Sequence, residues 1–250
     1  MSKNKSQSVA VIPARLKSSR FPEKVLAKIQ EKSLLKHTYD NVQNAKIFDE
    51  ILICTDHKKV LDHAKEFCDK SFLTSESCKN GTERICDLLK NTKDFPEDQI
   101  IFNIQADHPT IDKNTLIAIE KLLIEDPLAQ CATAGVPIVE KEDYLSPHKV
   151  KCLIDRYNNA LYFSRSPIPF LKKEKIGYPC LQHLGIYAFR RKFLDLYEKF
   201  ETTPLCEAED LEQLKILEYG YKIKVAVVDE VPIGIDTPED AKTFLKRLMV

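Results

Sequence analysis

The sequence predicts an α/β fold in which a mostly parallel central sheet carries helices on both faces and a smaller β-rich insertion is attached. Three observations predict it. In the first half of the chain, short apolar runs alternate with longer segments whose apolar residues recur at helical spacing. The apolar runs are continuous, as in parallel strands that are covered on both faces. After about residue 135 this alternation stops and prolines become frequent, which favours extended segments and turns.

The first half contains three strand–helix pairs. A parallel sheet binds its ligands in the loops beyond the carboxyl ends of its strands. The loops at residues 13–24, 55–58 and 105–110 are therefore the places where we expect functional side chains. The predicted strands are residues 9–12, 51–54 and 100–104, and the helical segments after them are residues 34–42, 60–67 and 116–124.

The second half begins with the β-rich insertion and ends in an α/β pattern. We predict one domain over residues 1–250, with the insertion at residues 135–205. Thr237 and Pro238 suit the N-cap and the first position of a last helix. The other predicted elements are a hairpin over residues 150–163 that turns at 156–159, a strand at 184–189, a helix at 208–218 and a strand at 222–228.

Charge and composition exclude several classes of protein. The 250 residues contain 38 Lys and Arg against 38 Asp and Glu, so the chain has no strong basic field for nucleic acid. No apolar run approaches the roughly 18 residues of a membrane span, and the first run is too short for the core of a signal peptide. The eight cysteines never form a CxxC or a zinc-ribbon spacing. We therefore expect a reduced, cytoplasmic protein that binds neither nucleic acid nor membrane.

Glycine is scarce, and this restricts how the chain can bind phosphate. The six glycines, against an average usage of about 7%, form neither GxGxxG nor GxxxxGK[ST]. This excludes a P-loop, and it excludes a dinucleotide-dependent dehydrogenase on the same strand–helix pattern. A phosphate site must rely on charged side chains and helix N-termini.

A cationic loop follows the first predicted strand and carries Arg15, Lys17, Arg20 and Lys24. Arginine offers a planar fork and lysine a compact charge to phosphate oxygens, so the loop suits a triphosphate. A merely solvated basic loop is the alternative. The position at a strand end favours the anion site.

Two carboxylates stand at other strand ends. Asp107 follows the most apolar strand, and Asp236 precedes the predicted N-cap Thr237. If they converge beside the cationic loop, they suit Mg²⁺ bound to a nucleoside triphosphate. Each could instead cap a turn or a helix, although Thr237 weakens that explanation for Asp236. His108 is expected to line the same site.

Two further segments have both a functional and a structural interpretation. Asn80 or Thr82 could cap a helix, or the backbone around Gly81 could read the edge of a nucleobase. Arg165 precedes a proline-rich loop and could pair with a substrate carboxylate or form a structural ion pair. The residues alone leave these alternatives open.

A series of short motifs stands in a fixed order along the chain. They are Ile12-Pro13-Ala14-Arg15, Ser19-Arg20-Phe21-Pro22, Lys24, Thr55-Asp56, Asn80-Gly81-Thr82-Glu83-Arg84, Asn103-Ile104-Gln105, Ala160-Leu161-Tyr162-Phe163-Ser164-Arg165, His183-Leu184-Gly185-Ile186-Tyr187, Leu211-Glu212-Gln213-Leu214 and Asp236-Thr237-Pro238-Glu239-Asp240. Each motif is weak alone. Together they resemble the family of 3-deoxy-manno-octulosonate (Kdo) cytidylyltransferases, from residue 9 to about residue 245.

The resemblance implies a nucleotidyltransferase fold of the glycosyltransferase-A type and a homodimer built through the insertion. It implies transfer of CMP from CTP to the anomeric hydroxyl of Kdo, which gives CMP-Kdo and pyrophosphate for lipopolysaccharide synthesis, with Mg²⁺ as the metal. Arg15, Lys24, Asp107 and Asp236 would be catalytic. By matching motif, the triphosphate would be held by Arg15, Arg20 and Lys24, and the metal by Asp107 and Asp236. The cytosine and ribose would be surrounded by Pro13, Ala14, Asn80, Gly81 and Thr82. The sugar acid would be held by Gln105, Arg165, His183, Tyr187, Glu212 and Gln213.

Three residues depart from the usual pattern of that family. Glu23 and Ala106 stand where the family has glycine, and His108 stands where it has an acid. If the glycine served a positive φ, its replacement is strained, and if it admitted a ligand, the added Cβ narrows the site. Two alternatives therefore stay open. One is the same reaction on a modified ulosonic acid, such as an amino-substituted Kdo or a sialic-acid-like sugar, and the other is a catalytically weak nucleotide- or sugar-binding homologue.

Overall fold

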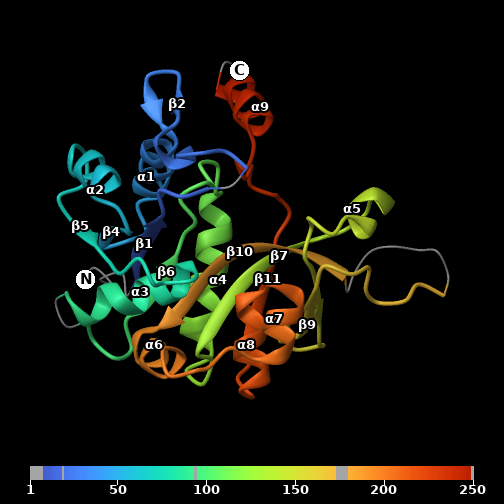
Figure 1. Ribbon diagram of the computed structural model, residues 1–250. Coiled ribbons are helices and arrows are strands. Elements are labelled where there is room, and N and C mark those ends of the chain that lie inside the picture. Colours follow the sequence, from blue (N-terminus) through green and yellow to red (C-terminus); the bar gives the residue numbers. More distant parts are fainter. Residues whose placement is uncertain (1–7, 19, 93–94, 173–179, 249–250) are drawn as a thin grey trace, which may run out of the picture. The chain divides into compact units, whose positions relative to one another are not determined.

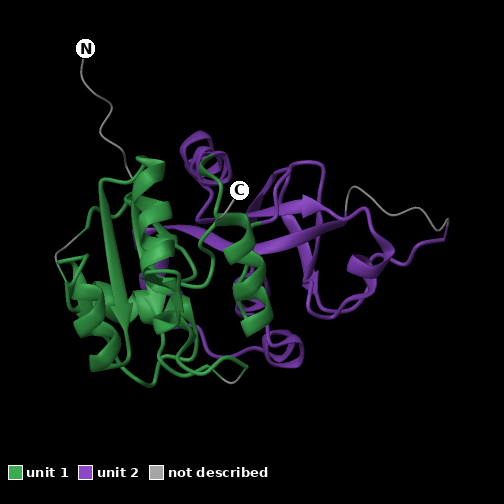
Figure 2. Ribbon diagram, turned by 90° about the horizontal axis from the view of Figure 1, so that it is seen from above, with its two compact units in different colours: residues 1–113, 232–250 green, residues 114–231 purple. Residues whose placement is uncertain are grey.

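The computed structural model describes residues 8–18, 20–92, 95–172 and 180–248. Ser19 of the predicted cationic loop lies outside the described residues, as do residues 173–179 of the predicted insertion. The chain divides into two compact units, which Figure 2 colours separately. The first unit comprises Met1–Lys113 with Pro232–Val250, and the second comprises Asn114–Val231.

The first unit is built on a parallel sheet with the strand order β6-β1-β4-β5 (Figure 1). All seven residues of β1 are buried, which is why its sequence is a continuous apolar run. A short antiparallel pair, β2 with β3, forms a separate sheet. The strands are β1 (Ser8–Ala14), β2 (Lys28–Ile29), β3 (Lys32–Ser33), β4 (Glu50–Thr55), β5 (Ser71–Leu73) and β6 (Ile100–Asn103).

Helices lie on both faces of this parallel sheet. Helix α1 connects β1 to β4 and α2 connects β4 to β5, so the chain moves in one direction across the sheet, and α3 then brings it back from β5 to β6. Because crossovers between parallel strands are right-handed, α3 lies on the face opposite α1 and α2 (Figure 1). The last helix, α9, packs Phe244 against Ile29, Leu34 and Ile235. The helices are the 3₁₀ turn η1 (Lys24–Leu26), α1 (Leu34–Ala45), α2 (Lys58–Lys65), α3 (Gly81–Lys90) and α9 (Pro238–Leu248).

Side-chain caps fix where these helices begin. Ser33 accepts a hydrogen bond from the Lys36 amide at the start of α1. Thr237 accepts one from the Asp240 amide at 3.2 Å, and Pro238 takes the first helical position of α9, as predicted. These caps define the first turns of α1 and α9.

The second unit is mainly antiparallel. Strand β7 pairs in parallel with β11 and antiparallel with β10, and β10, β8 and β9 pair antiparallel in that order. Its strands are β7 (Cys131–Pro137), β8 (Lys151–Ile154), β9 (Ala160–Ser164), β10 (Cys180–Arg190) and β11 (Ile223–Val227), and its helices are α4 (Lys113–Glu125), α5 (Lys141–Leu145), α6 (Arg191–Tyr197), α7 (Pro204–Glu209) and α8 (Glu212–Glu218).

The predicted fold class is confirmed, with one wrong element. The helical segment predicted at residues 208–218 is two helices, α7 and α8, because Asp210 adopts a left-handed conformation with φ 51° and ends the first of them. The predicted hairpin is present as β8 and β9. Its turn is held by Asp155, whose Oδ1 accepts from the amides of Tyr157 and Asn159 at 2.8 Å each.

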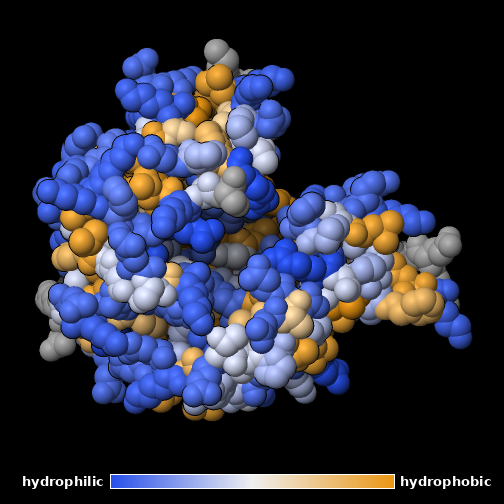
Figure 3. Space-filling view, in the orientation of Figure 1, coloured by the Kyte–Doolittle hydropathy of each residue, from blue (hydrophilic) through white to orange (hydrophobic). Residues whose placement is uncertain are grey.

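The chemistry of the surface and of the thiols agrees with the composition. No helix in the described part of the chain is long and apolar enough to cross a membrane. Hydrophilic side chains dominate the face shown in Figure 3, and apolar side chains are scattered over it. All eight cysteines are free thiols.

Packing in the second unit leads to a test of stability. A Cβ at Gly135 in β7 would lie 2.9 Å from Leu181 Cβ and 3.2 Å from the Gln182 carbonyl oxygen. Because both neighbours belong to the paired strand β10, neither can move without disturbing the ladder. Gly135→Ala should therefore lower the free energy of unfolding by about 1–3 kcal/mol. Thermal and urea unfolding measure this, and an unchanged stability would contradict the close packing.

Candidate active site

The carboxyl edge of the parallel sheet brings several predicted residues into contact. Helix α3 begins against the ends of β1 and β6, since a Cβ at Gly81 would lie 3.1 Å from Pro13 Cγ and 3.2 Å from Asn103 Nδ2. Asn103 also donates a hydrogen bond to Thr82 Oγ1 at 3.1 Å. Glycine lets the helix approach this closely without displacing these two side chains. Pro13, Ala14, Gly81 and Thr82 therefore share one region, as predicted.

Asn80 is the N-cap of α3, so the capping interpretation is confirmed for it. Its Oδ1 accepts from the Glu83 amide at 2.8 Å, and Glu83 returns the contact by accepting from Asn80 Nδ2 and from the Lys79 amide. The cap fixes the orientation of the α3 N-terminus beside Pro13. Gln105 lies near the same edge, and its amide nitrogen is 3.5 Å from Asn103 Oδ1.

One lysine connects the two predicted metal ligands. Lys24 Nζ lies 2.5 Å from Asp107 Oδ2 and 2.8 Å from Asp236 Oδ1. Arg20 approaches the other oxygen of Asp236 at 3.0 Å. Lys24 comes from η1, Asp107 from the turn after β6 and Asp236 from the segment before α9. The predicted convergence of these residues is present. Arg15 lies in the same loop as Arg20 and is exposed.

Opposing effects set the pKa values of this cluster. Burial alone would lower the pKa of Lys24, but the charge and hydrogen bond of Asp107, with those of Asp236, raise it above its ordinary value. Burial alone would raise the pKa of Asp236, but Lys24 and then Arg20 hold it below its ordinary value. Lysine and aspartate therefore both stay charged at neutral pH.

The two aspartates fit a magnesium ion. Carboxylate oxygens from both residues lie within 2.8 Å of a single atom, so both can point at one cation. Among the described residues, no group of three or more His, Cys, Asp or Glu could hold a metal ion. Magnesium suits such a site, because it is commonly held by one or two carboxylates while substrate phosphates and waters complete its six ligands.

Glu23 and Ala106, which stand where the resembled family has glycine, differ in backbone conformation. Glu23 has φ 52° and ψ 30°, the left-handed conformation that favours glycine, and its carboxylate pairs with Lys59 at 2.5 Å. Its negative charge is thus compensated outside the Lys24 cluster. Ala106 does not have a positive φ and is only 4% exposed. At this position the added Cβ is buried and leaves the backbone unstrained.

His108 lines the cluster, as predicted. Its Nε2 lies 3.9 Å from Asp107 Oδ1. The ring also covers Gly234, where a Cβ would approach Nε2 to 3.1 Å. The imidazole therefore occupies the space between the Asp107 turn and the segment that leads to Asp236.

In the second unit, neutral groups hold the guanidinium of Arg165. Its Nε donates to the Glu209 carbonyl at 2.8 Å, and its terminal nitrogens donate to the carbonyls of Pro147 and Asp210 at 3.3 and 3.2 Å. The Glu209 carboxylate instead accepts from the Arg165 amide and from Ser164 Oγ. Among the described residues, backbone carbonyls rather than a carboxylate therefore hold this guanidinium. These orient the guanidinium without neutralising it.

A β-bulge brings His183 and Tyr187 together. Four residues of a regular strand span about 13 Å, yet these two rings have centroids 5.3 Å apart. The register of β10 against β7 shifts between them, and Gly185 within the shift has φ 65°. Glycine is the residue that this conformation favours. The bulge thus brings the ring of His183 next to the buried ring of Tyr187.

Neighbouring groups set the chemistry of these two side chains. Thr133 Oγ1 lies 2.6 Å from the Ile186 carbonyl and 3.0 Å from His183 Nε2. Since the hydroxyl has one hydrogen and the carbonyl can only accept, Thr133 accepts from His183, which fixes the imidazole hydrogen on Nε2. Burial, with the nearby charge of Glu212, raises the pKa of Tyr187 well above its ordinary value. Tyr187 therefore stays a neutral hydroxyl.

Glu212 and Gln213 lie in the first turn of α8, which follows directly on the Arg165 contacts at Glu209 and Asp210. Gln213 is 3% exposed, and within the described part of the chain its Nε2 has no hydrogen-bond partner. A buried amide donor of this kind is costly unless something binds it. The roles of Thr133 and Glu209 were not predicted, because only the folded chain brings them to His183 and Arg165.

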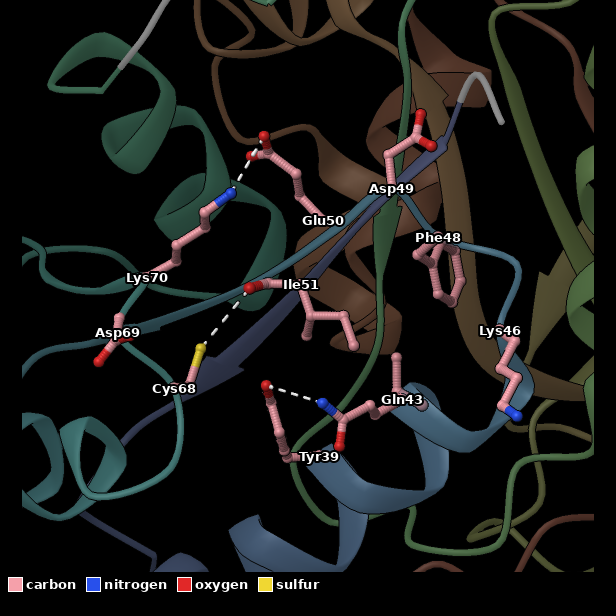
Figure 4. Close-up of a pocket in the computed structure, with 11 residues that line it drawn as sticks. Tyr39, Gln43, Lys46, Phe48, Asp49, Glu50, Ile51, Cys68, Asp69 and Lys70 are labelled. Carbon is pink, nitrogen blue, oxygen red and sulfur yellow. Dashed lines mark hydrogen bonds and ion pairs between the residues drawn. The ribbon is translucent and has the colours of Figure 1, made fainter. Parts of the chain in front are cut away.

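A pocket on the first unit lies away from these residues. It has a volume of about 340 Å³ and lies at the amino end of β4, whereas the cluster around Lys24 lies at the carboxyl edge (Figure 4). Within its lining, Lys70 pairs with Glu50, and Gln43 lies within hydrogen-bond distance of Tyr39. None of the site residues predicted from the sequence lines this pocket.

A family model described as cytidylyltransferase matches residues 9–223. This chain belongs to the cytidylyltransferase family. The matched residues include the cationic loop, Asp107, both bulge residues and the start of α8.

Three similar proteins place this cytidylyltransferase more narrowly. A 3-deoxy-manno-octulosonate cytidylyltransferase of Protochlamydia amoebophila is 42% identical over 94% of this chain and 91% of the relative. The mitochondrial one of Arabidopsis thaliana is 40% identical over 96% of this chain and 82% of the relative. A solved structure of CMP:2-keto-3-deoxy-manno-octonic acid synthetase complexed with CTP has 31% identity and a TM-score of 0.88, and the match covers 97% of this chain and 98% of that chain. The predicted family is confirmed.

Glu23 of this cytidylyltransferase provides a test of backbone strain. A residue with a Cβ in the left-handed region costs about 1 kcal/mol or more relative to glycine. Glu23→Gly and Glu23→Ala both remove the exposed ion pair with Lys59, but only the glycine removes the strain. Glu23→Gly should be more stable than Glu23→Ala by about 1 kcal/mol in urea unfolding. Equal stabilities would contradict the left-handed conformation.

The lowered pKa of Asp236 predicts how the stability of the cytidylyltransferase depends on acid. Because the folded pKa lies below the ordinary value of 3.8, ionised Asp236 stabilises the fold above that pH, and this contribution disappears as the pH falls through the lower folded pKa. In metal-free buffer, Asp236→Asn should flatten the fall in unfolding free energy between about pH 5 and pH 2. Lys24→Met should flatten the same fall, because without Lys24 the folded pKa of Asp236 moves back toward its unfolded value. A fall in Lys24→Met as steep as in the unmodified protein would show that Lys24 does not set this pKa.

Proposed function

We propose that this cytidylyltransferase transfers CMP from CTP to the anomeric hydroxyl of 3-deoxy-manno-octulosonate, with release of pyrophosphate. The observation that carries the proposal is the convergence of Asp107 and Asp236 on Lys24 beside Arg20. It provides carboxylates for a metal and cations for phosphate at one sheet edge. The relatives that bear the name of this activity match the chain over nearly its whole length.

The first unit would hold CTP. We assign the triphosphate to Arg15, Arg20 and Lys24, whose charges suit phosphate oxygens. The capped start of α3, against the end of β1, supports a binding region for cytosine and ribose. The residues assigned to that region are Pro13, Ala14, Asn80, Gly81 and Thr82.

Asp107 and Asp236 would hold Mg²⁺. When bound there, the ion supplies a Lewis acid that neutralises charge on the phosphate oxygens and on the attacking hydroxyl. With both carboxylates engaged by the metal, the ammonium of Lys24 is available to a phosphate oxygen. Arg20 would likewise exchange its contact with Asp236 for a phosphate.

We assign the sugar acid mainly to residues of the second unit. The guanidinium of Arg165, oriented by three carbonyls that leave its charge uncompensated, suits the carboxylate of the sugar. The buried amide of Gln213 and the neutral hydroxyl of Tyr187 suit sugar hydroxyls. His183, Glu212 and, in the first unit, Gln105 complete the assignment.

The reaction is an in-line displacement. The anomeric oxygen forms a bond to the α-phosphorus of CTP, the bond from that phosphorus to the bridging oxygen breaks so that pyrophosphate leaves, and the hydroxyl proton passes to water. Such a reaction depends on positioning and on neutralising charge, which the fixed cations of the first unit provide. We propose that no covalent enzyme intermediate forms. The proposed catalytic residues are Arg15, Lys24, Asp107 and Asp236.

The remaining proposals concern the assembly and its location. We propose a homodimer formed through the insertion at residues 135–205, within a nucleotidyltransferase domain that spans residues 1–250. The eight free thiols support a reducing compartment such as the cytoplasm. CTP and a small anionic sugar acid are the proposed partners, without nucleic acid or membrane.

A coupled pyrophosphate assay with CTP and a panel of sugar acids tests the activity. We expect turnover with Kdo that depends on Mg²⁺. Preference for an amino-substituted Kdo or a sialic acid would assign the enzyme to a modified ulosonic acid, to which His108 and Ala106 could adapt it. Absence of pyrophosphate release with every sugar would identify a binding homologue instead.

Asp107→Ala provides the matched test of the proposed metal site. Losing one of two carboxylates should lower kcat at least about a hundredfold, as the loss of a transition-state charge contact does. Lys59→Ala is the control, because Lys59 belongs to the same edge but pairs only with Glu23 among the contacts described above. An Asp107→Ala enzyme with full activity would contradict the proposed role.

A further inference from the structure

A carboxylate directly after β4 binds the backbone of the loop that carries Arg15. The backbone N–H of Leu16 donates to Asp56 Oδ1 at 3.1 Å. Leu16 follows Arg15 directly, and Asp56 is the first residue after β4. The strand end therefore holds the loop at the point where the proposed triphosphate contacts begin.

The other oxygen of Asp56 faces a buried arginine. Arg84 projects from α3 with a side chain only 4% exposed, and its guanidinium lies 3.5 Å from Asp56 Oδ2. Its other terminal nitrogen donates to Thr74 Oγ1 at 2.9 Å and to the Ser75 carbonyl at 3.1 Å. A buried guanidinium is costly unless its charge is compensated, and Asp56 supplies the negative charge.

The acceptors of Arg84 belong to a rigid frame. Thr74 donates to the Thr55 carbonyl through both its amide, at 2.8 Å, and its hydroxyl, at 2.9 Å. This joins the segment after β5 to the last residue of β4. Arg84 is thus held between two strand ends, and it in turn orients Asp56 toward Leu16.

The same helix also begins at the proposed nucleoside region. Gly81 and Thr82 contact Pro13 and Asn103, and Arg84 lies one turn further along α3. An α-helix rises only 1.5 Å per residue, so the start of α3 and Arg84 move as one body. The position of the cationic loop is therefore set by the element that also shapes the nucleoside region.

We propose that Asp56 and Arg84 are positioning residues that hold the cationic loop in register with the nucleoside region. They act through the Leu16 amide and contact no substrate. The inference rests on the proposed binding of CTP by this loop and extends it to two residues for which we have assigned no role. Its consequence is specific: loss of the pair weakens binding of the triphosphate and spares the nucleoside.

Calorimetric binding of CTP and of cytidine to the purified protein tests this inference without any sugar acid. Asp56→Ala should weaken CTP about tenfold, as loss of a hydrogen bond to a charged group does, and should change cytidine by less than about twofold. Asp56→Asn keeps an oxygen that can accept from Leu16 and should lose less affinity than Asp56→Ala. Asp40→Asn is the control, since Asp40 pairs with Lys32 on the other side of the sheet from α3.

A double-variant comparison separates positioning from simple loss of stability. If the pair acts as one unit, Arg84→Met combined with Asp56→Ala should weaken CTP no more than Asp56→Ala alone does. If Arg84→Met fails to fold, the test is the CTP and cytidine affinity of the two Asp56 variants, with their thermal unfolding measured alongside. Equal weakening of CTP and cytidine, or unchanged CTP affinity, would overturn the inference. Absence of CTP binding by the unmodified protein would instead overturn the proposed function.

Discussion

Lys24 places one positive charge between two carboxylates from distant parts of the chain. Asp107 is 83 residues and Asp236 is 212 residues from it in sequence, and both lie within 2.8 Å of its ammonium nitrogen. Either carboxylate without this lysine would face the other at short range, which is unfavourable in a partly buried site. The turn after β6, the 3₁₀ turn η1 and the segment before α9 therefore meet at this one charge, and the Ile235 amide also donates to the Asp107 carbonyl at 2.9 Å. The proposed metal site depends on this meeting point.

The balanced net charge of the protein conceals a strong local separation. Cations of the loop after β1 meet carboxylates at the ends of other strands, as Arg20 and Lys24 do with Asp236, and two further ion pairs lie outside this cluster. Glu23, an acid beside Lys24, pairs with Lys59, and Arg84 is compensated by Asp56. A chain with no net charge thus concentrates cations and carboxylates at one edge of the parallel sheet.

The second unit obtains its chemistry from backbone conformation more than from charge. The bulge at Gly185 folds β10 enough to bring His183 beside Tyr187, and three neutral carbonyls orient Arg165. Both arrangements fix the direction of a polar side chain through neutral partners, since Thr133 accepts from His183 and backbone carbonyls accept from Arg165. Such preorganisation is what a site for a small polar ligand requires, because less ordering remains to be done on binding.

The sequence by itself determined the fold class, the family and the residues of the Lys24 cluster. Continuous apolar runs identify buried parallel strands, and the carboxyl ends of such strands must meet at one edge, so Asp107 could be placed beside the loop that carries Lys24 from its position alone. Local chemistry also sufficed for the caps at Asn80 and Thr237, because a cap involves residues only three positions apart.

Only the tertiary structure decided the contacts between residues far apart in sequence. It showed that Glu23 pairs with Lys59, that Arg165 binds carbonyls 44 and 45 residues away, and that Asp56 joins Leu16 to Arg84. It also divided the helix predicted at residues 208–218 at Asp210, where a left-handed residue overrides a helical pattern. The physical reason is the same in each case: the partner of a charge or backbone group is chosen by packing in space, and spacing along the chain carries no record of it.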